Sequence, residues 1–276
     1  ALALLPFLLP LSGSAQNWSF GIFAGGANYN GDLSKASPVF IEETNPSFGV
    51  LARHNFTQYI TVKGSLTYGR ISGDDANNES KAYTELRNLS FRSDIYEASL
   101  QGEINIFGFD PSDRDNRFAL YLSGGISVYR FNPQSKYEGE WVDLQPLATE
   151  GQGTSEFPNR EKYSLTQVSF PLGGGIKYAL DRNWVIGIDA GVRRTLTDYL
   201  DDVSRTYAPE GTFNTDTEMG RRAFRLSNRT WDSESLDGAK EYGANDRRGN
   251  RNTKDWYMFG GLTLTYTISD PSCQTF

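Results

Sequence analysis

The chain has one cysteine, one histidine and, past residue 16, no long apolar run. Because a single cysteine, Cys273, excludes an internal disulfide, the fold must depend on burial and hydrogen bonds alone. No segment after residue 16 approaches the roughly eighteen apolar residues that a transmembrane helix needs, so any membrane is crossed by strands. The net charge of -7 argues against nucleic acid as a partner.

An apolar run occupies the start of the chain. Residues 1–16, ALALLPFLLPLSGSAQ, end in small residues, as in a signal peptide whose basic start has been trimmed. A buried or membrane-spanning helix is the alternative, but the run is short and contains Pro6 and Pro10. We therefore expect a signal peptide over 1–16 and one folded domain over 17–276.

Apolar and polar residues alternate in about eight later segments. In DWYMFGGLTLTYTI (255–268), Leu262 and Leu264 fall on one face while Thr263 and Thr265 fall on the other. The same pattern predicts strands at 18–29, 47–55, 58–71, 91–107, 117–131, 164–180, 183–197 and 255–268. We predict an all-β fold, an eight-stranded antiparallel transmembrane β-barrel. A water-soluble β-sandwich is the alternative, but its turns would be more uniform in length.

The links between the predicted strands alternate between short and long. The short links lie at 56–58, 107–117 and 180–183, and the long ones near 30–46, 72–90, 132–163 and 198–254, the last being a long loop insertion. Barrels of this kind have short periplasmic turns and long extracellular loops. We therefore expect an outer-membrane location, contact with outer-membrane lipids, and both termini in the periplasm.

Aromatic residues cluster at the predicted strand ends, where amphipathic rings suit a lipid interface. At the periplasmic ends they are Trp18, Tyr59, Phe107, Phe109, Phe118 and Trp184. At the outer ends they are Tyr29, Phe48, Tyr68, Phe91, Tyr129, Phe131 and Trp256. The sequence thus predicts two aromatic rims.

Charged residues of both signs fall on the predicted inner face of the barrel. They are Lys63, Glu97, Glu103, Lys177, Asp189 and Arg193. An eight-stranded barrel is just wide enough for its own side chains, so a diffusion pore is not expected. The mixed signs favour a network of ion pairs in the lumen, with a proton or ion path as the alternative.

Signals for catalysis or cofactor binding are weak, and we expect neither an enzyme nor a cofactor. The only histidine, His54, falls near a turn, where it is more typical of a membrane interface than of a hydrolase. Asp110, Asp113 and Asp115 superficially suggest calcium, but their spacing misses the EF-hand pattern, which favours a solvated turn.

The last long loop contains a run of basic residues, namely Arg221, Arg222, Arg225, Arg229, Arg247, Arg248 and Arg251. Two interpretations stay open for this run. The arginines bind lipopolysaccharide phosphates or an acidic partner, or they are simply solvated residues of a loop.

Five segments resemble one family. They are ANYNGDL (27–33), RNLSFRSDIYE (87–97), WVDLQPLATEGQG (141–153), YSLTQVSFPLGGGIKY (163–178) and GVRRTLTDYLDDVSRTY (191–207). Together they look like the PorG family, small outer-membrane barrels of the type IX secretion system of Bacteroidota. The resemblance covers most of the mature chain in order, except about 208–254.

The resemblance implies a role in protein secretion. PorG-like barrels are thought to contact the periplasmic ring built from the PorK lipoprotein and PorN, and to serve gliding motility in gliding species. A periplasmic ring can touch only what projects below the membrane. The best candidate is the turn 108–117, which carries Asp110, Asp113, Arg114, Asp115 and Arg117 beside Pro111.

Two other functions remain open from the sequence. A generic barrel of the OmpA or OmpX kind, acting as an adhesin or membrane stabiliser, explains the alternation but not the family-like segments. A barrel enzyme acting on lipid would depend on His54 or on a carboxylate of the lumen.

Overall fold

The computed structural model describes residues 17–34, 43–77, 82–232 and 242–268. The predicted signal peptide, 1–16, and the segment with Cys273 lie outside these described residues. Among the described residues, no helix has both the length and the apolar character to cross a membrane.

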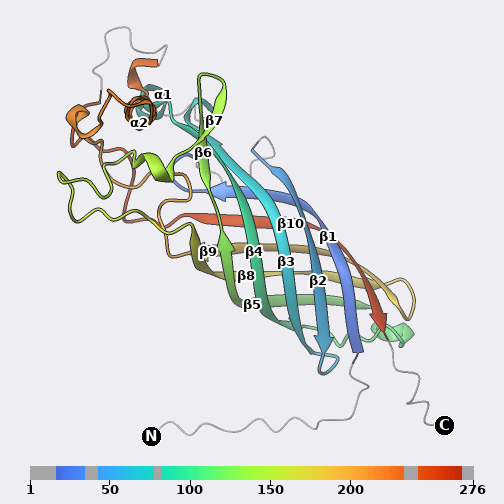
Figure 1. The fold of residues 1–276 in the computed structure, drawn as a ribbon. Helices are drawn as coiled ribbons and strands as arrows, with labels where there is room; N and C mark the ends of the chain where they lie inside the picture. Colours follow the sequence, from blue (N-terminus) through green and yellow to red (C-terminus); the bar gives the residue numbers. More distant parts are fainter. Residues whose placement is uncertain (1–16, 35–42, 78–81, 233–241, 269–276) are drawn as a thin grey trace, which may run out of the picture.

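Eight antiparallel strands close a barrel within the described part of the chain (Figure 1). They are β1 (Asn17–Asn30), β2 (Asn45–Asn55), β3 (Ile60–Asp74), β4 (Ser90–Asn105), β5 (Phe118–Arg130), β8 (Thr166–Ala179), β9 (Trp184–Thr195) and β10 (Trp256–Ile268). Each strand pairs with its neighbour in the chain, β1 pairs with β10, and β3–β4 pairing completes the ring. The predicted eight-stranded antiparallel barrel is confirmed.

The strands alternate between a polar inner face and an apolar outer face. On β5, Leu120, Leu122 and Ile126 are exposed on the outside, whereas Ser123 and Ser127 are buried in the lumen. Burial in the lumen is complete at the centre, where Glu103 of β4 has no exposed surface. The period-2 pattern of the sequence therefore sets which side chains fill the barrel.

Connections at the two rims differ as predicted. Short links at 56–59, 106–117 and 180–183 form what we call the short-turn rim, where β1 begins and β10 ends. The long connections gather at the opposite end (Figure 1). Strands β6 (Pro133–Tyr137) and β7 (Glu140–Asp143) form a hairpin there, beside the helices α1 (Ala82–Arg87) and α2 (Glu218–Ser227).

We call the described parts of these long connections, 31–34, 43–44, 75–77, 82–89, 131–165, 196–232 and 242–255, the cap. Its short 3-10 helices are Asp75–Asn77, Gln145–Leu147, Glu210–Thr212 and Thr230–Asp232, and a fifth, Arg114–Asn116, lies in the short-turn rim. The cap shares one apolar core with the barrel mouth, since Leu200, Val203 and Leu226 pack in the same cluster as Tyr129 and Tyr257. The long loops are therefore folded onto the barrel rather than extended into solvent.

Four of the seven aromatic residues predicted for the rim at the cap end face inward instead. Phe48 and Trp256 are exposed on the outer wall, as expected of rim residues. Tyr29, Phe91 and Tyr129, however, are buried in the core that joins barrel and cap, together with Phe131. Their phase in the strands places them on the inner face, so the alternation itself contained this information.

Candidate functional site

The part of the lumen nearer the short-turn rim contains an ionic group around Glu103 of β4. Its carboxylate accepts from Arg53 Nε of β2 at 3.0 Å and from Lys177 Nζ of β8 at 2.8 Å, and Lys63 Nζ of β3 lies 3.5 Å away. Lys63 also donates to Asp189 of β9 at 2.6 Å. The structure thus brings four of the six predicted lumen residues into one group, which includes cations from three strands.

The other two predicted lumen residues form a second pair nearer the cap. Arg193 Nε donates to Glu97 at 3.2 Å, and the Tyr257 hydroxyl donates to the same carboxylate at 2.6 Å. The Arg193 guanidinium also lies 4.7 Å from the ring centre of Phe259. The carboxylate of Glu97 is therefore paired with a cation and hydrogen-bonded inside the barrel.

Arg53 belongs to this lumen network and was missed in the sequence. It is 3% exposed, pairs with Glu103, and its second terminal nitrogen lies 3.8 Å from Asp189. The signal was present, because Arg53 is in phase with the buried Leu51 on β2. The alternation of β1 and β2 is hard to follow in the sequence, because the strands contain several glycines and have apolar residues on both faces.

Little space is left between the two ionic groups. A cavity of about 20 Å³ lies among Lys63, Gln101, Asp189, Arg193 and Phe259, which is enough for about one water molecule. At the short-turn rim, Phe109 turns inward and packs with Ala119 and Ala179. The predicted contact of Phe109 with the lipid interface is therefore wrong, because its ring seals the lumen, whereas Phe107 is exposed.

The short-turn rim presents the predicted partner-binding segment. Asp110 and Asp113 are occupied within the turn, since Ser112 N donates to Asp110 at 2.9 Å and Asp115 N donates to Asp113 at 3.0 Å. The bond from Asp115 N, together with one from the Asn116 side chain, favours the ionised form of Asp113 and lowers its pKa. Arg114 and Asp115 are exposed at the tip, and Arg117 is half-buried at its base. Two of the three carboxylates that suggested calcium, those of Asp110 and Asp113, therefore hold the turn in shape.

Two of the family-like segments meet in the cap. Glu150 of TEGQG accepts from the amides of Ser204 at 2.9 Å and Arg205 at 3.0 Å, and Arg248 lies 3.3 Å from the same carboxylate. Asp202 of TDYLDDVS accepts from the hydroxyls of Thr149 and Tyr163. These segments are thus buried, and their polar residues hold the loops together.

Some charged residues of the cap are exposed, and others are buried in ion pairs. Arg248 is 2% exposed and donates to the Asp202 carbonyl at 2.6 Å, so the solvated interpretation of the basic run is wrong for this residue. A second buried pair joins Arg87 to Asp75 at 2.6 Å. Burial raises the pKa of Asp202 to about 6, although Arg248 and two hydroxyl groups favour its ionised form.

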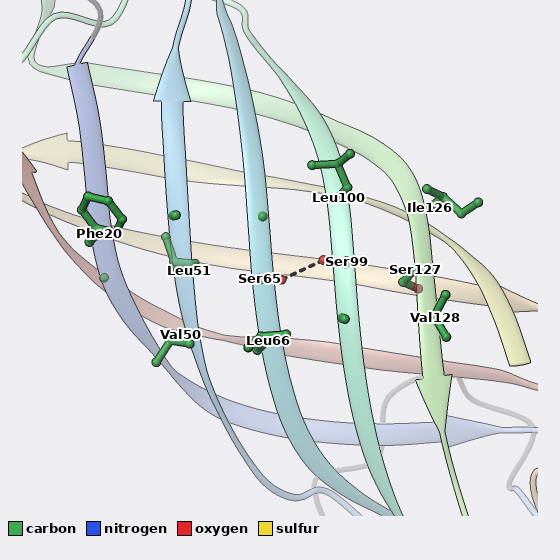
Figure 2. Close-up of a pocket in the computed structure, with 14 residues that line it drawn as sticks. Phe20, Val50, Leu51, Ser65, Leu66, Ser99, Leu100, Ile126, Ser127 and Val128 are labelled. Atoms are coloured by element: carbon green, nitrogen blue, oxygen red, sulfur yellow. Dashed lines mark hydrogen bonds between the residues drawn. The ribbon is translucent and has the colours of Figure 1, made fainter. Parts of the chain in front are cut away.

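The outer wall has a shallow hollow of about 810 Å³ across β1 to β5 (Figure 2). Phe20, Leu66 and Leu100 border it, and small residues such as Gly64 lie between them; an added Cβ on Gly64 would meet no atom within 4 Å. The hydroxyls of Ser65 and Ser99 hydrogen-bond to each other at 2.7 Å. The lining suits an acyl chain better than a polar substrate.

His54 lies on the outer face beside the short-turn rim. Its ring packs between Trp18 and Phe56, with centroid distances of 4.6 and 4.7 Å. This setting suits an interface residue. No cluster of His, Cys, Asp or Glu with metal-binding geometry occurs in the described ranges.

One family matches the chain over nearly its whole length. The family described as "Domain of unknown function (DUF6089)" matches residues 2–211 and 223–275. No curated protein sequence matches the chain.

Three solved outer-membrane proteins have a similar fold at low sequence identity. Ail of Yersinia pestis is 11% identical, with a TM-score of 0.42, covering 92% of this chain and 100% of that one. The N-terminal barrel domain of Pseudomonas aeruginosa OprF is 11% identical, with a TM-score of 0.37 and coverage of 92% and 100%. Neisserial surface protein A is 11% identical, with a TM-score of 0.41 and coverage of 92% and 97%.

Proposed function

We propose that this chain, which belongs to the family described as "Domain of unknown function (DUF6089)", is a non-enzymatic outer-membrane barrel that anchors other proteins and does not conduct solutes. The observation that carries this proposal is a closed barrel that is apolar outside, filled with ion pairs inside, and covered by a folded cap.

The outer wall supports a place in lipid. Leu66, Ile104, Leu122 and Leu262 are each more than 60% exposed on it. A water-soluble protein rarely exposes so continuous an apolar band, whereas a barrel in a bilayer requires one. By the same rule, the short-turn rim, where β1 begins and β10 ends, faces the periplasm, and the cap faces outward.

The interior supports an anchoring role. The Glu103 group crosses the lumen, Phe109 closes it at the short-turn rim, and the cap covers the other mouth. Reconstituted protein should therefore give no stepwise conductance in planar bilayers, with a porin as the positive control. Steady single-channel currents would contradict the closed-barrel proposal.

More specifically, we propose that the barrel is a component of type IX protein secretion and binds a PorK-like ring lipoprotein and a PorN-like protein. It rests on the five family-like segments. The exposed tip Arg114–Asp115 is the surface that this role requires, because Asp110 and Asp113 hold it in one conformation at small entropic cost.

The tip can be tested without disturbing the turn. Asp113 should be kept, since it caps the 3-10 helix Arg114–Asn116. We expect Arg114→Ser with Asp115→Ser to leave a heat-modifiable barrel in the outer membrane, but to weaken co-purification with the ring lipoprotein and reduce type IX secretion. Arg182→Ser, in the exposed neighbouring short turn, is the matched control.

The alternative is a generic small barrel that acts as a membrane stabiliser or adhesin. The closed lumen and apolar wall suit it equally well. A deletion strain with normal secretion but a leaky envelope or reduced surface attachment would favour it. Loss of secretion, restored by the full chain, would favour the type IX role.

A further inference from the structure

Three carboxylates are buried where the cap meets the barrel mouth. Asp198 and Asp201 follow β9, and Asp255 precedes β10; they are 3%, 1% and 1% exposed. Within the described residues, no lysine or arginine nitrogen lies within 4 Å of any of them. This differs from Glu150 and Asp75 in the same cap, which pair with Arg248 and Arg87.

The three carboxylates accept hydrogen bonds from uncharged donors of the cap and the barrel mouth. Asp201 accepts from the Tyr29 hydroxyl of β1 at 2.5 Å and from Val203 N at 2.9 Å. Asp255 accepts from Leu200 N at 2.9 Å, and Asp198 from the Ser204 hydroxyl at 2.7 Å. Asp201 and Asp255 thus fasten the segment 198–204 to β1 and to the residue before β10, and Asp198 closes the segment on itself.

The carboxylates are also close to one another. A Cβ added to Gly31 would lie 2.1 Å from Tyr29 Oη and 2.3 Å from Asp255 Oδ1, so both oxygens border the same glycine. The second oxygen of Asp198 is buried without a hydrogen-bond partner. Half-buried Asp32, which accepts from Asn250 N at 2.8 Å, adds a further negative group.

Such an arrangement favours the protonated form. Moving an isolated carboxylate from water into a protein interior is costly, and adjacent carboxylates repel one another. We propose that the cap is a proton-dependent closure: protons held by Asp198, Asp201 and Asp255 keep segment 198–204 on the barrel mouth, and their loss at alkaline pH loosens it.

The charges around the cluster do not offset this effect. Arg87 and Lys254 favour ionisation of Asp201 and Asp198 respectively, and Arg87 and Arg247 favour ionisation of Asp32. Asp32, Glu150 and the other members of the cluster oppose it. Burial is the largest influence in each case; it raises the pKa of Asp198 to about 7 and the pKa values of Asp201 and Asp255 well above the usual range.

The direction of the pH effect follows from linkage. The folded cap holds each proton more tightly than the opened cap, whose aspartates return toward a pKa of 3.8. The stabilisation is therefore complete below that value and decreases as the pH rises through about 7 for Asp198, and at higher pH for the other two.

Amide hydrogen exchange on the full chain in lipid nanodiscs tests this proposal. The amides of Leu200 and Val203 donate directly to the cluster, so they report its state. After correction for intrinsic exchange, their protection should fall between pH 6 and 9, by about tenfold per pH unit for each proton released. The amide of Ser99, in the barrel wall, should keep its protection.

A neutral variant separates titration from other effects of pH. Asp198→Asn with Asp255→Asn keeps an oxygen for the Ser204 hydroxyl and the Leu200 amide. It should flatten the pH dependence and leave Leu200 at least tenfold better protected than in the wild type at pH 9. Protection in the wild type that does not change with pH would overturn the proposal.

Discussion

The lumen and the centre of the cap bury carboxylates in opposite ways. In the lumen, Glu103 is surrounded by Arg53, Lys63 and Lys177, which come from three different strands. At the centre of the cap, the described residues give Asp201 and Asp255 only hydroxyl and amide donors. Ion pairs inside a closed barrel need no proton, whereas the unpaired aspartates of the cap do.

The difference reflects how each region is built. In a closed barrel, strands distant in sequence face each other across the lumen, so a carboxylate of β4 meets cations of β2, β3 and β8. In the cap, Asp198, Asp201 and Asp202 lie within five consecutive residues and must bury their charges together. Among the described residues, only Asp202 of these has a cationic nitrogen within 4 Å, that of Arg248 at 3.8 Å.

The largest expected effect comes from removing the centre of the lumen network. Glu103→Gln leaves the buried cations Arg53 and Lys177 without their carboxylate, and breaking a buried ion pair in this way costs about 3–5 kcal/mol. We expect a loss of this size in urea unfolding of the barrel in lipid vesicles, read by heat-modifiable migration. Ser123→Ala, also in the lumen but uncharged, is the control.

A smaller loss for Glu103→Gln, equal to that of the control, would show that the ionic group adds no stability. The lumen and the cap would then differ in their pairing but not in what the pairing does for the fold.

The next effect tests which face of a strand belongs to the lumen. Leu122, 62% exposed on the outer wall, precedes Ser123, 9% exposed inside. Leu122→Arg should cost about 2–4 kcal/mol of barrel stability, because it places a charge in the hydrocarbon region. Ser123→Arg instead meets the filled lumen and should reduce the yield of folded barrel through lack of volume.

Leu264 and Thr263 form the same kind of pair on β10 and repeat the test. Equal unfolding free energies and equal folding yields for all four arginine variants would contradict the register. A shift of one residue would exchange the two faces throughout a strand.

Most of the barrel could be predicted because one physical rule controls it. Alternation of polar and apolar residues places Lys63, Glu97 and Lys177 inside, and link length separates the two rims. The strand bounds differ from those predicted by three residues or fewer, as at β3, which is predicted over 58–71 and observed at Ile60–Asp74. Pairing inside the lumen follows, because closure leaves those side chains no other neighbours.

The cap could not be predicted in this way. Its segments have no common period, and Arg248 finds Glu150 across 98 residues of chain. Seven nearby arginines suggested a solvated basic surface, and nothing in their spacing distinguishes the buried one. The hairpin β6–β7 was missed for a related reason: its strands are short, and Gly139 with a φ of 89° forms the turn inside a region counted as loop.

The smallest effect concerns Asp202, which stands between the two classes of carboxylate. It is near Arg248 yet also depends on the Tyr163 hydroxyl, which donates to it at 2.7 Å. Tyr163→Phe keeps the ring stacked on Tyr199 but removes this hydrogen bond, which should cost the cap about 1.5 kcal/mol.

The same substitution should raise the pKa of Asp202 above its value of about 6, because the lost bond favoured the ionised form. Since this pKa already exceeds the ordinary 3.8, a bound proton stabilises the cap at acid pH, and the stabilisation would now be lost at a higher pH than before. Carboxyl carbon NMR of Asp202 measures the shift. Tyr207→Phe, which removes a buried hydroxyl without a hydrogen-bond partner, is the matched control. An unchanged pKa in Tyr163→Phe would mean that Arg248 alone governs Asp202, which would place it with the charge-paired carboxylates of the lumen.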